Sequence, residues 1–122
     1  MIPAEIPEPL RSAALDPPEA GELEAAWTPD DALAVLDALE GTFVAVVRGQ
    51  AYQRAPLGAK MRESGDALIP IDGSWELPPM QGETESSRAR RSRAEAAVFV
   101  RAQRYLGVDF VSLEFSYQDE AA

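Results

Sequence analysis

The chain of 122 residues contains no cysteine and no histidine. Without cysteine it can form no disulfide, no thiolate nucleophile and no cysteine-ligated zinc site. Without histidine it lacks imidazole metal ligands, the serine-histidine-aspartate triad and the side chain that usually exchanges protons near neutral pH. Any catalysis would fall to carboxylate, lysine, arginine, tyrosine or serine side chains. The two absences therefore remove most enzyme mechanisms, although they do not exclude an enzyme.

Long apolar runs are also missing. No apolar run exceeds five residues, whereas a membrane-spanning helix needs about 20. The first residues are rich in proline and hold no basic cluster, so we expect no secretory signal and a cytoplasmic protein. A chain of this length buries about two thirds of its unfolded surface, and 46% of its residues are apolar. One domain with a substantial core is expected.

Positive charge is scarce, because 21 acidic residues oppose 11 basic ones and give a net charge of −10. Residues 1–40 hold ten of the acids with Arg11 as the only base, whereas residues 84–105 hold six arginines and two glutamates. The net charge repels nucleic acid and anionic lipid. It suits either a merely soluble surface or a surface for a partner with a basic face. Composition leaves both interpretations open.

The first 26 residues are rich in proline, glutamate and alanine. Proline removes backbone donors, so this segment is interpreted as an extended arm packed on the domain, with at most one helical turn at 9–15. Residues 27–118 are expected to form the domain itself, and residues 119–122 a frayed tail.

Two helices are predicted from capping signals and periodicity. The first spans 29–40, with Thr28 as N-cap, Pro29 at the first position and Gly41 as the stop; Asp30 and Asp37 lie on its solvent side. The second spans 86–106. Its four arginines within one narrow arc form a basic stripe, which we interpret as solvated or matched to the acidic N-terminal third: Arg90, Arg93, Arg101 and Arg104.

Strands are predicted at 42–47, at 51–54 after a turn or bulge at Gly49, at 68–71 and at 108–117. Pro70 makes the third an edge or a bulged strand, and Asp72 and Gly73 indicate a turn. Residues 55–66 are interpreted as an ordinary loop, because Gly58 and Lys60 lack the spacing of a phosphate-binding loop. The order of elements predicts an α+β domain, with two main helices packed on one face of a small, mostly antiparallel sheet.

No motif specifies a catalytic, cofactor or metal site, and the acid pairs are interpreted as solvating. Trp75 lies beside the predicted turn, where a large aromatic is an interface anchor if exposed and a core residue if buried. The candidate partner-binding residues are Asp30, Asp37, Tyr52, Asp72, Trp75 and Glu76. We expect a monomer or a weak dimer, since Pro70 opposes pairing along the edge at 68–71.

The order of features from Trp27 to Ser116 resembles a known family. A tryptophan precedes an acid-capped helix (WTPDDAL, residues 27–33), which leads into an apolar strand and a glycine turn with tyrosine (VVRGQAY, residues 46–52). A segment at 69–75 (IPIDGSW) runs to a turn tryptophan, and an alanine-rich helix and a closing strand at 110–115 follow. This order is similar to that of small cytosolic α+β immunity proteins encoded beside bacterial polymorphic toxins.

The resemblance implies a binder that occludes the C-terminal domain of a cognate toxin and performs no chemistry. Its partner would be a protein with a basic face, without direct contact to nucleic acid or membrane. A nuclease toxin would attract the acidic chain through its basic substrate groove and speed association at low salt. The alternatives are a small acidic adaptor or structural subunit of another complex and, less favoured, a carboxylate-based enzyme, which needs a concave site and a carboxyl of raised pKa.

Overall fold

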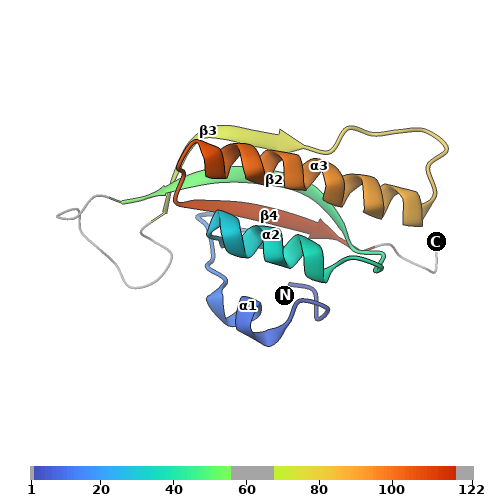
Figure 1. The fold of residues 1–122 in the computed structure, drawn as a ribbon, viewed down its shortest axis with the longest axis horizontal. Helices are drawn as coiled ribbons and strands as arrows, with labels where there is room; N and C mark the ends of the chain where they lie inside the picture. The colour runs from blue at the N-terminus through green and yellow to red at the C-terminus, as the bar shows by residue number, and fades with distance from the viewer. Residues whose placement is uncertain (1, 56–67, 118–122) are drawn as a thin grey trace.

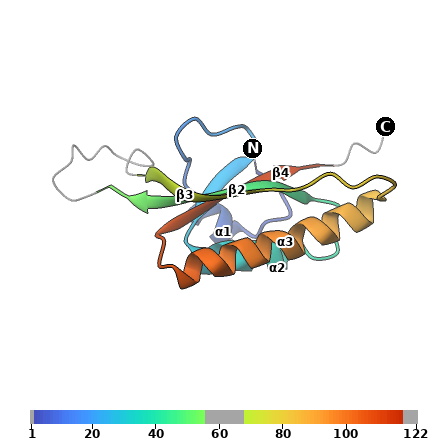
Figure 2. The same ribbon diagram turned by 90° about the horizontal axis from the view of Figure 1, so that it is seen from above.

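The structure is a computed structural model that describes residues 2–55 and 68–117. Its helices are α1 (Glu8–Ala13), α2 (Pro29–Ala38) and α3 (Glu85–Tyr105), and its strands are β1 (Glu24–Trp27), β2 (Ala45–Arg54), β3 (Leu68–Glu76) and β4 (Phe110–Ser116). The strands pair antiparallel in the order β1-β4-β2-β3. Figure 1 shows α2 and α3 side by side in front of this sheet, and Figure 2 shows both on the same side of it. The predicted α+β class is confirmed.

Both main helices begin at a threonine N-cap, Thr28 as predicted and Thr84, which pattern reading did not name. The Thr28 hydroxyl accepts a hydrogen bond from the Asp31 backbone N–H at 3.2 Å, and Thr84 does the same for Ser87 at 3.1 Å. Each hydroxyl satisfies one of the N–H groups that a helix start leaves unpaired. The predicted helix bounds differ from the observed ones by one or two residues. The predicted loop at 56–66 and the tail at 119–122 lie outside the described residues.

The main core lies between the sheet and the two helices. Trp27 is 1% exposed and meets the Phe115 ring edge-on, with ring centroids 6.0 Å apart. Aliphatic side chains of α2, β2 and β4 fill the rest of the layer: Val35, Leu36, Leu39, Val46, Val111 and Leu113. This layer fixes α2 and α3 on the sheet, and so determines which side chains remain outside.

The sequence predicts a turn or bulge at Gly49. The turn is wrong, because β2 extends from Ala45 to Arg54, and the register against β4 shifts just before the glycine, between Val46 and Arg48. Gly49 lies under the ring of Phe99 in α3, and a Cβ atom there would stand 2.8 Å from the ring carbon Cε2. The glycine is needed for close packing of helix on strand and not for a turn. Near this contact, the buried Ser92 hydroxyl of α3 accepts from the Val46 N–H at 2.9 Å.

The turn predicted at Asp72 and Gly73 is also wrong, because β3 continues through it to Glu76 as an edge strand. The register shifts from Gln50 opposite Ser74 to Tyr52 opposite Pro70, so the residues at 71–73 bulge. The Gln50 side-chain amide donates to the Ile71 carbonyl at 2.7 Å and pairs one backbone group in the bulge. A bulge and a proline both protect an exposed edge from unwanted pairing.

The N-terminal segment contributes α1, which overlaps the helical turn expected at 9–15, and the edge strand β1, which pattern reading did not foresee. The Trp27 indole N–H donates to the Leu10 carbonyl at 2.7 Å, and Ile6 is 1% exposed. Leu15 and Ala26 exchange backbone hydrogen bonds of 2.9 and 2.8 Å. The segment is thus fastened to the domain at several points, beside α2 (Figure 1).

Candidate partner-binding surfaces

The sheet face opposite α2 and α3, here called the second face, carries a row of charged side chains. Cross-strand partners place Glu24 of β1 beside Glu114 of β4, Glu114 beside Arg48 of β2, and Arg48 beside Glu76 of β3. We call these four residues the acidic row. Their neighbours Trp27, Gly49, Leu113 and Trp75 belong to the helix side, so strand alternation turns the row to the second face.

The acidic row combines three carboxylates with a single guanidinium. Arg48 and Glu114 form an ion pair of 2.6 Å, with side chains 55% and 30% exposed. Such an exposed pair contributes little to stability because water screens it. The Glu24 carboxylate accepts from the Gly21 N–H at 3.2 Å, whereas Glu76 is fully at the surface. The row therefore keeps a net negative charge on a rigid platform.

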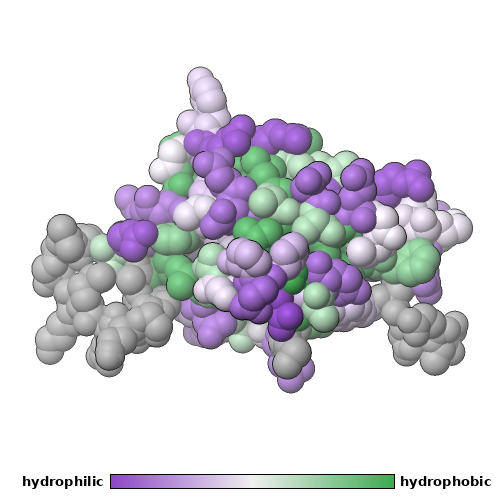
Figure 3. All heavy atoms as spheres, turned by 60° about the horizontal axis from the view of Figure 1, so that its bottom comes forward, coloured by the Kyte–Doolittle hydropathy of each residue, from purple (hydrophilic) through white to green (hydrophobic). Residues whose placement is uncertain are grey.

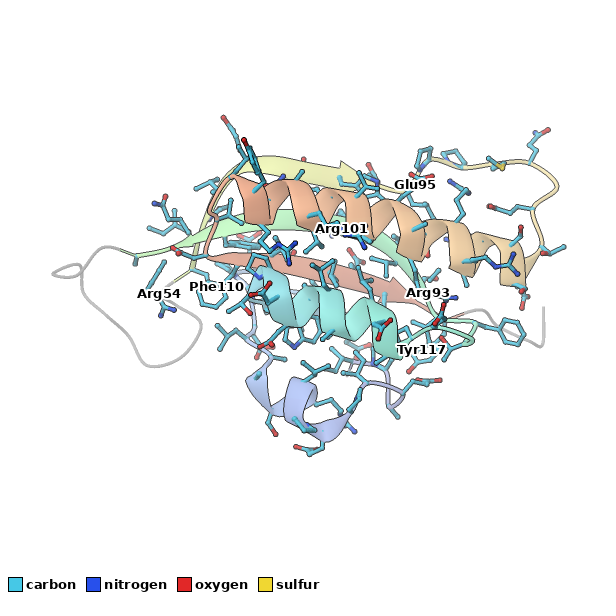
Figure 4. All side chains as sticks on the ribbon, in the orientation of Figure 1. Arg54, Arg93, Glu95, Arg101, Phe110 and Tyr117 are labelled. Atoms are coloured by element: carbon cyan, nitrogen blue, oxygen red, sulfur yellow. The ribbon has the colours of Figure 1, made fainter. Side chains whose placement is uncertain are left out.

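One end of the second face is apolar and well packed. Ala26, Tyr52, Leu68 and Phe110 form a small buried cluster. The Arg54 guanidinium lies 5.0 Å from the centroid of the Phe110 ring, in the geometry of a cation–π contact (Figure 4). Burial raises the pKa of the Tyr52 hydroxyl, and the negative charge of Glu24 raises it further. The hydroxyl is consequently neutral at physiological pH.

On the helix side, antiparallel α2 and α3 leave a groove of about 550 Å³ between them, here called the α2–α3 groove. Its floor is apolar, from Leu33, Leu36, Ala94 and Ala97. Figure 3 shows an oblique view in which hydrophobic side chains form a band between hydrophilic ones. Asp37 and Glu40 on the α2 rim face arginines on the α3 rim: Arg90, Arg93 and Arg101.

The arginines of α3 fall into two groups. Arg104 pairs with Asp30 at 3.1 Å, and Arg93 donates to the carbonyls of Thr42 and Val44 at 3.1 and 3.0 Å. Arg90 and Arg101 are exposed, and neither makes an ion pair with the residues at 2–55 and 68–117. Figure 4 shows Arg101 between the two helices and Arg93 beside the end of α2. The basic stripe is therefore only partly matched to the acids of α2.

The sequence-derived candidates do not form one site. Asp30 and Asp37 are exposed on α2, on the helix side. Tyr52 and Glu76 lie on the second face, and Asp72 lies in the bulge of the edge strand. Trp75 is half-buried under α3 and stacks on Phe99, with ring centroids 6.4 Å apart.

Sequence reasoning missed the partners that complete the acidic row, namely Glu24, Arg48 and Glu114. The period-two alternation of β4 already puts Glu114 on the face of Phe110 and Ser112, opposite Leu113. The alternation indicates the sheet face on which Glu114 lies. It does not give the cross-strand register, which pairs residues about 90 positions apart in the chain.

No family model, curated protein or solved structure matches this chain. None of the helices in the described ranges is long and apolar enough to cross a membrane. No cluster of three or more acidic side chains suited to a metal ion occurs among those same residues. Chemically, the second face and the α2–α3 groove offer charge and shape for binding.

Proposed function

We propose that this chain is an immunity protein, which binds a cognate bacterial toxin domain in the cytoplasm and neutralises it by occlusion. The observation that carries the proposal is the acidic row, which crosses all four strands on the second face. The order of features from Trp27 to Ser116 resembles that of such proteins. The lack of histidine and cysteine suits a protein that only binds.

Charge favours the second face over the helix side as the surface for the toxin. The acidic row has three carboxylates for one guanidinium, whereas the α2–α3 groove has three arginines for two carboxylates. A basic toxin surface, such as the phosphate-binding groove of a nuclease, is attracted to the acidic row and not to the α2–α3 groove. The partner is therefore a protein with a basic face.

The sheet also makes the row a rigid ligand. Neighbouring strands lie about 4.8 Å apart, so four strands spread the row over about 14 Å. Because the backbone already fixes the spacing, little conformational entropy is lost when a partner binds. The Arg48–Glu114 pair is exposed and weak, so a cation of the partner can exchange for Arg48 at Glu114.

The test is co-expression with the toxin-like domain encoded beside the gene, followed by growth rescue and association kinetics at low and high salt. Two variants with the same charge separate the faces. Glu24→Gln with Glu76→Gln changes the second face, and Asp30→Asn with Asp37→Asn changes α2; each moves the net charge from −10 to −8. We expect the first pair to slow association about three- to tenfold at low salt, and the second pair to slow it less.

A failure to form a complex, together with no growth rescue, contradicts the immunity function and leaves the adaptor as the better description. A tight complex whose association rate responds equally to both variants keeps the function but removes the second face as the specific contact. A stronger effect of the α2 variant assigns the toxin contact to Asp30 and Asp37.

A further inference from the structure

The α2–α3 groove lies on the side of the sheet away from the acidic row. It is open along its length, with an apolar floor and arginines along the α3 rim. Phe43, 58% exposed, borders it after the end of α2. An apolar floor with a charged rim is the pattern of a groove that receives a peptide segment.

Some charged side chains that line the groove have no oppositely charged partner among the described residues. Arg93 is held by the Thr42 and Val44 carbonyls and fixes the end of the groove. Arg90 and Arg101 have no ion pair with the described residues, although the chain has an excess of acids. A guanidinium offers a planar fork of donors that matches a carboxylate with two parallel hydrogen bonds. The forks of Arg90 and Arg101 have no carboxylate partner among residues 2–55 and 68–117.

The spacing of these two arginines limits what can occupy the groove. They are eleven positions apart on α3, which a helical rise of 1.5 Å per residue converts to about 16 Å. A single small anion could contact both guanidinium groups only if the two side chains moved toward each other along the helix. An extended peptide rises about 3.3 Å per residue and turns every second side chain to the same side, so two carboxylates four residues apart lie about 13 Å apart on one side, within reach of one flexible guanidinium each.

We propose that the α2–α3 groove binds an extended acidic segment of a partner protein, with carboxylates four residues apart on one side and apolar side chains between them. The carboxylates pair with Arg90 and Arg101, and the apolar side chains lie on Leu33, Leu36 and Ala97. A second copy of this chain is a poor occupant, because each copy carries a net charge of −10. Nucleic acid carries a negative charge at every nucleotide, so the same field repels it more strongly than a segment with two carboxylates.

The test uses fluorescein-labelled octapeptides and fluorescence anisotropy on the full chain. The first peptide has two glutamates four positions apart with leucine and alanine between them, the second has the glutamates adjacent, and the third has glutamine in their place. We expect the first to bind with saturation, and the other two at least about fivefold more weakly.

Two charge-matched variants separate the groove from the general field. Arg90→Ala with Arg101→Ala removes the free forks, and Arg88→Ala with Arg104→Ala removes two arginines of the same helix that do not line the groove; each moves the net charge from −10 to −12. We expect the first pair to weaken peptide binding about tenfold or more, and the second by less than about threefold. Circular dichroism verifies that both variants keep the fold.

Several results would overturn the proposal. Equal weakening in both double variants means that only the overall charge is sensed. Absence of saturable binding of the first peptide up to about 1 mM, which corresponds to a binding free energy of only about −4 kcal/mol, means that the groove takes no such segment. Competition by inorganic phosphate at a similar concentration assigns a small-anion site, and tighter binding of a labelled single-stranded oligonucleotide assigns nucleic acid.

Discussion

Gly49 shows how closely α3 lies on the sheet. Its neighbour is the Phe99 ring, which itself stacks on Trp75 from the edge strand. A methyl group added at Gly49 of β2 would therefore press on the Phe99 ring of α3 and, through that ring, on Trp75 of β3. Interiors packed to this density tolerate extra volume poorly, because neither the ring nor the strand has space to move.

The substitution Gly49→Ala should consequently lower the free energy of unfolding by about 1–3 kcal/mol. The matched control is Gly21→Ala, where a Cβ would meet nothing within 4 Å, and where the change should lie between neutral and about 1 kcal/mol of stabilisation. Urea denaturation of the two variants measures both. If Gly49→Ala matched the control, the close approach of Phe99 would not be important for stability.

The residue types around Gly49 favour a turn, which is not the reason that a glycine is needed there. A glycine between two apolar runs is typical of a turn, and the same holds for the pair Asp72 and Gly73. At Gly49 the requirement comes from an aromatic ring 50 positions further along the chain, and at Gly73 from the α3 side chain Gln103 and a bulge in an edge strand. Requirements set by such distant neighbours leave no local mark in the sequence.

At the scale of elements, α3 is joined to the segment before it by one arginine. Arg91 donates to both carboxylate oxygens of Glu83 at 2.6 and 2.8 Å, to the Pro78 carbonyl at 2.9 Å and to Glu95 at 3.2 Å. These hydrogen bonds hold the connection from β3 against the first turns of α3. The same bonds keep the pKa of the Glu83 carboxyl below its ordinary value.

A lowered pKa in the folded chain means that Glu83 stabilises the fold above the ordinary glutamate pKa, and that this contribution is lost as the pH falls through the lowered value. The variant Glu83→Gln should thus be less stable than the natural chain at pH 7, and the difference should disappear toward acid pH. Urea midpoints at both pH values measure this, with Glu19→Gln, an exposed turn residue, as control. A difference that persisted at acid pH would contradict an ionic origin.

Helices and strands differ in how much of their placement the sequence reveals. The starts of α2 and α3 follow from Thr28 and Thr84 with acids in the first turn, because capping is a contact between residues three apart. Strand order and register depend on contacts between distant residues. The sequence therefore did not predict the edge strand β1 or the place of Glu24 in the acidic row, and only the structure shows them. Of the six candidate residues, pattern reading placed only Asp30 and Asp37 on a common surface, the solvent side of α2.

At the scale of the whole molecule, the excess of acids acts on every surface together. A net charge of −10 on 122 residues makes the folded state repel itself. The four ion pairs among the described residues offset only part of this repulsion. Salt should therefore stabilise the fold by screening.

Raising the ionic strength from about 0.01 to 0.15 M shortens the Debye length from about 30 to 8 Å. We expect the melting temperature at pH 7 to rise by about 2–5 °C, as for a gain of about 1 kcal/mol in a chain of this size. Near the isoelectric pH of 4.4 the same salt step should have little effect. Differential scanning calorimetry measures both; a fall in melting temperature at pH 7 would mean that the ion pairs outweigh the repulsion.

The central place of β4 has a consequence for the moment at which the protein becomes functional during synthesis. A ribosome makes β4 last of the four strands, yet β4 pairs with both β1 and β2. Until it emerges, β1 has no partner in the sheet, and Glu24 stays apart from Glu76. Contacts between such distant segments form late and slow the folding of the chain. The acidic row is thus complete only after β4 has emerged, because Glu114 joins Glu24 to Arg48 in the cross-strand register.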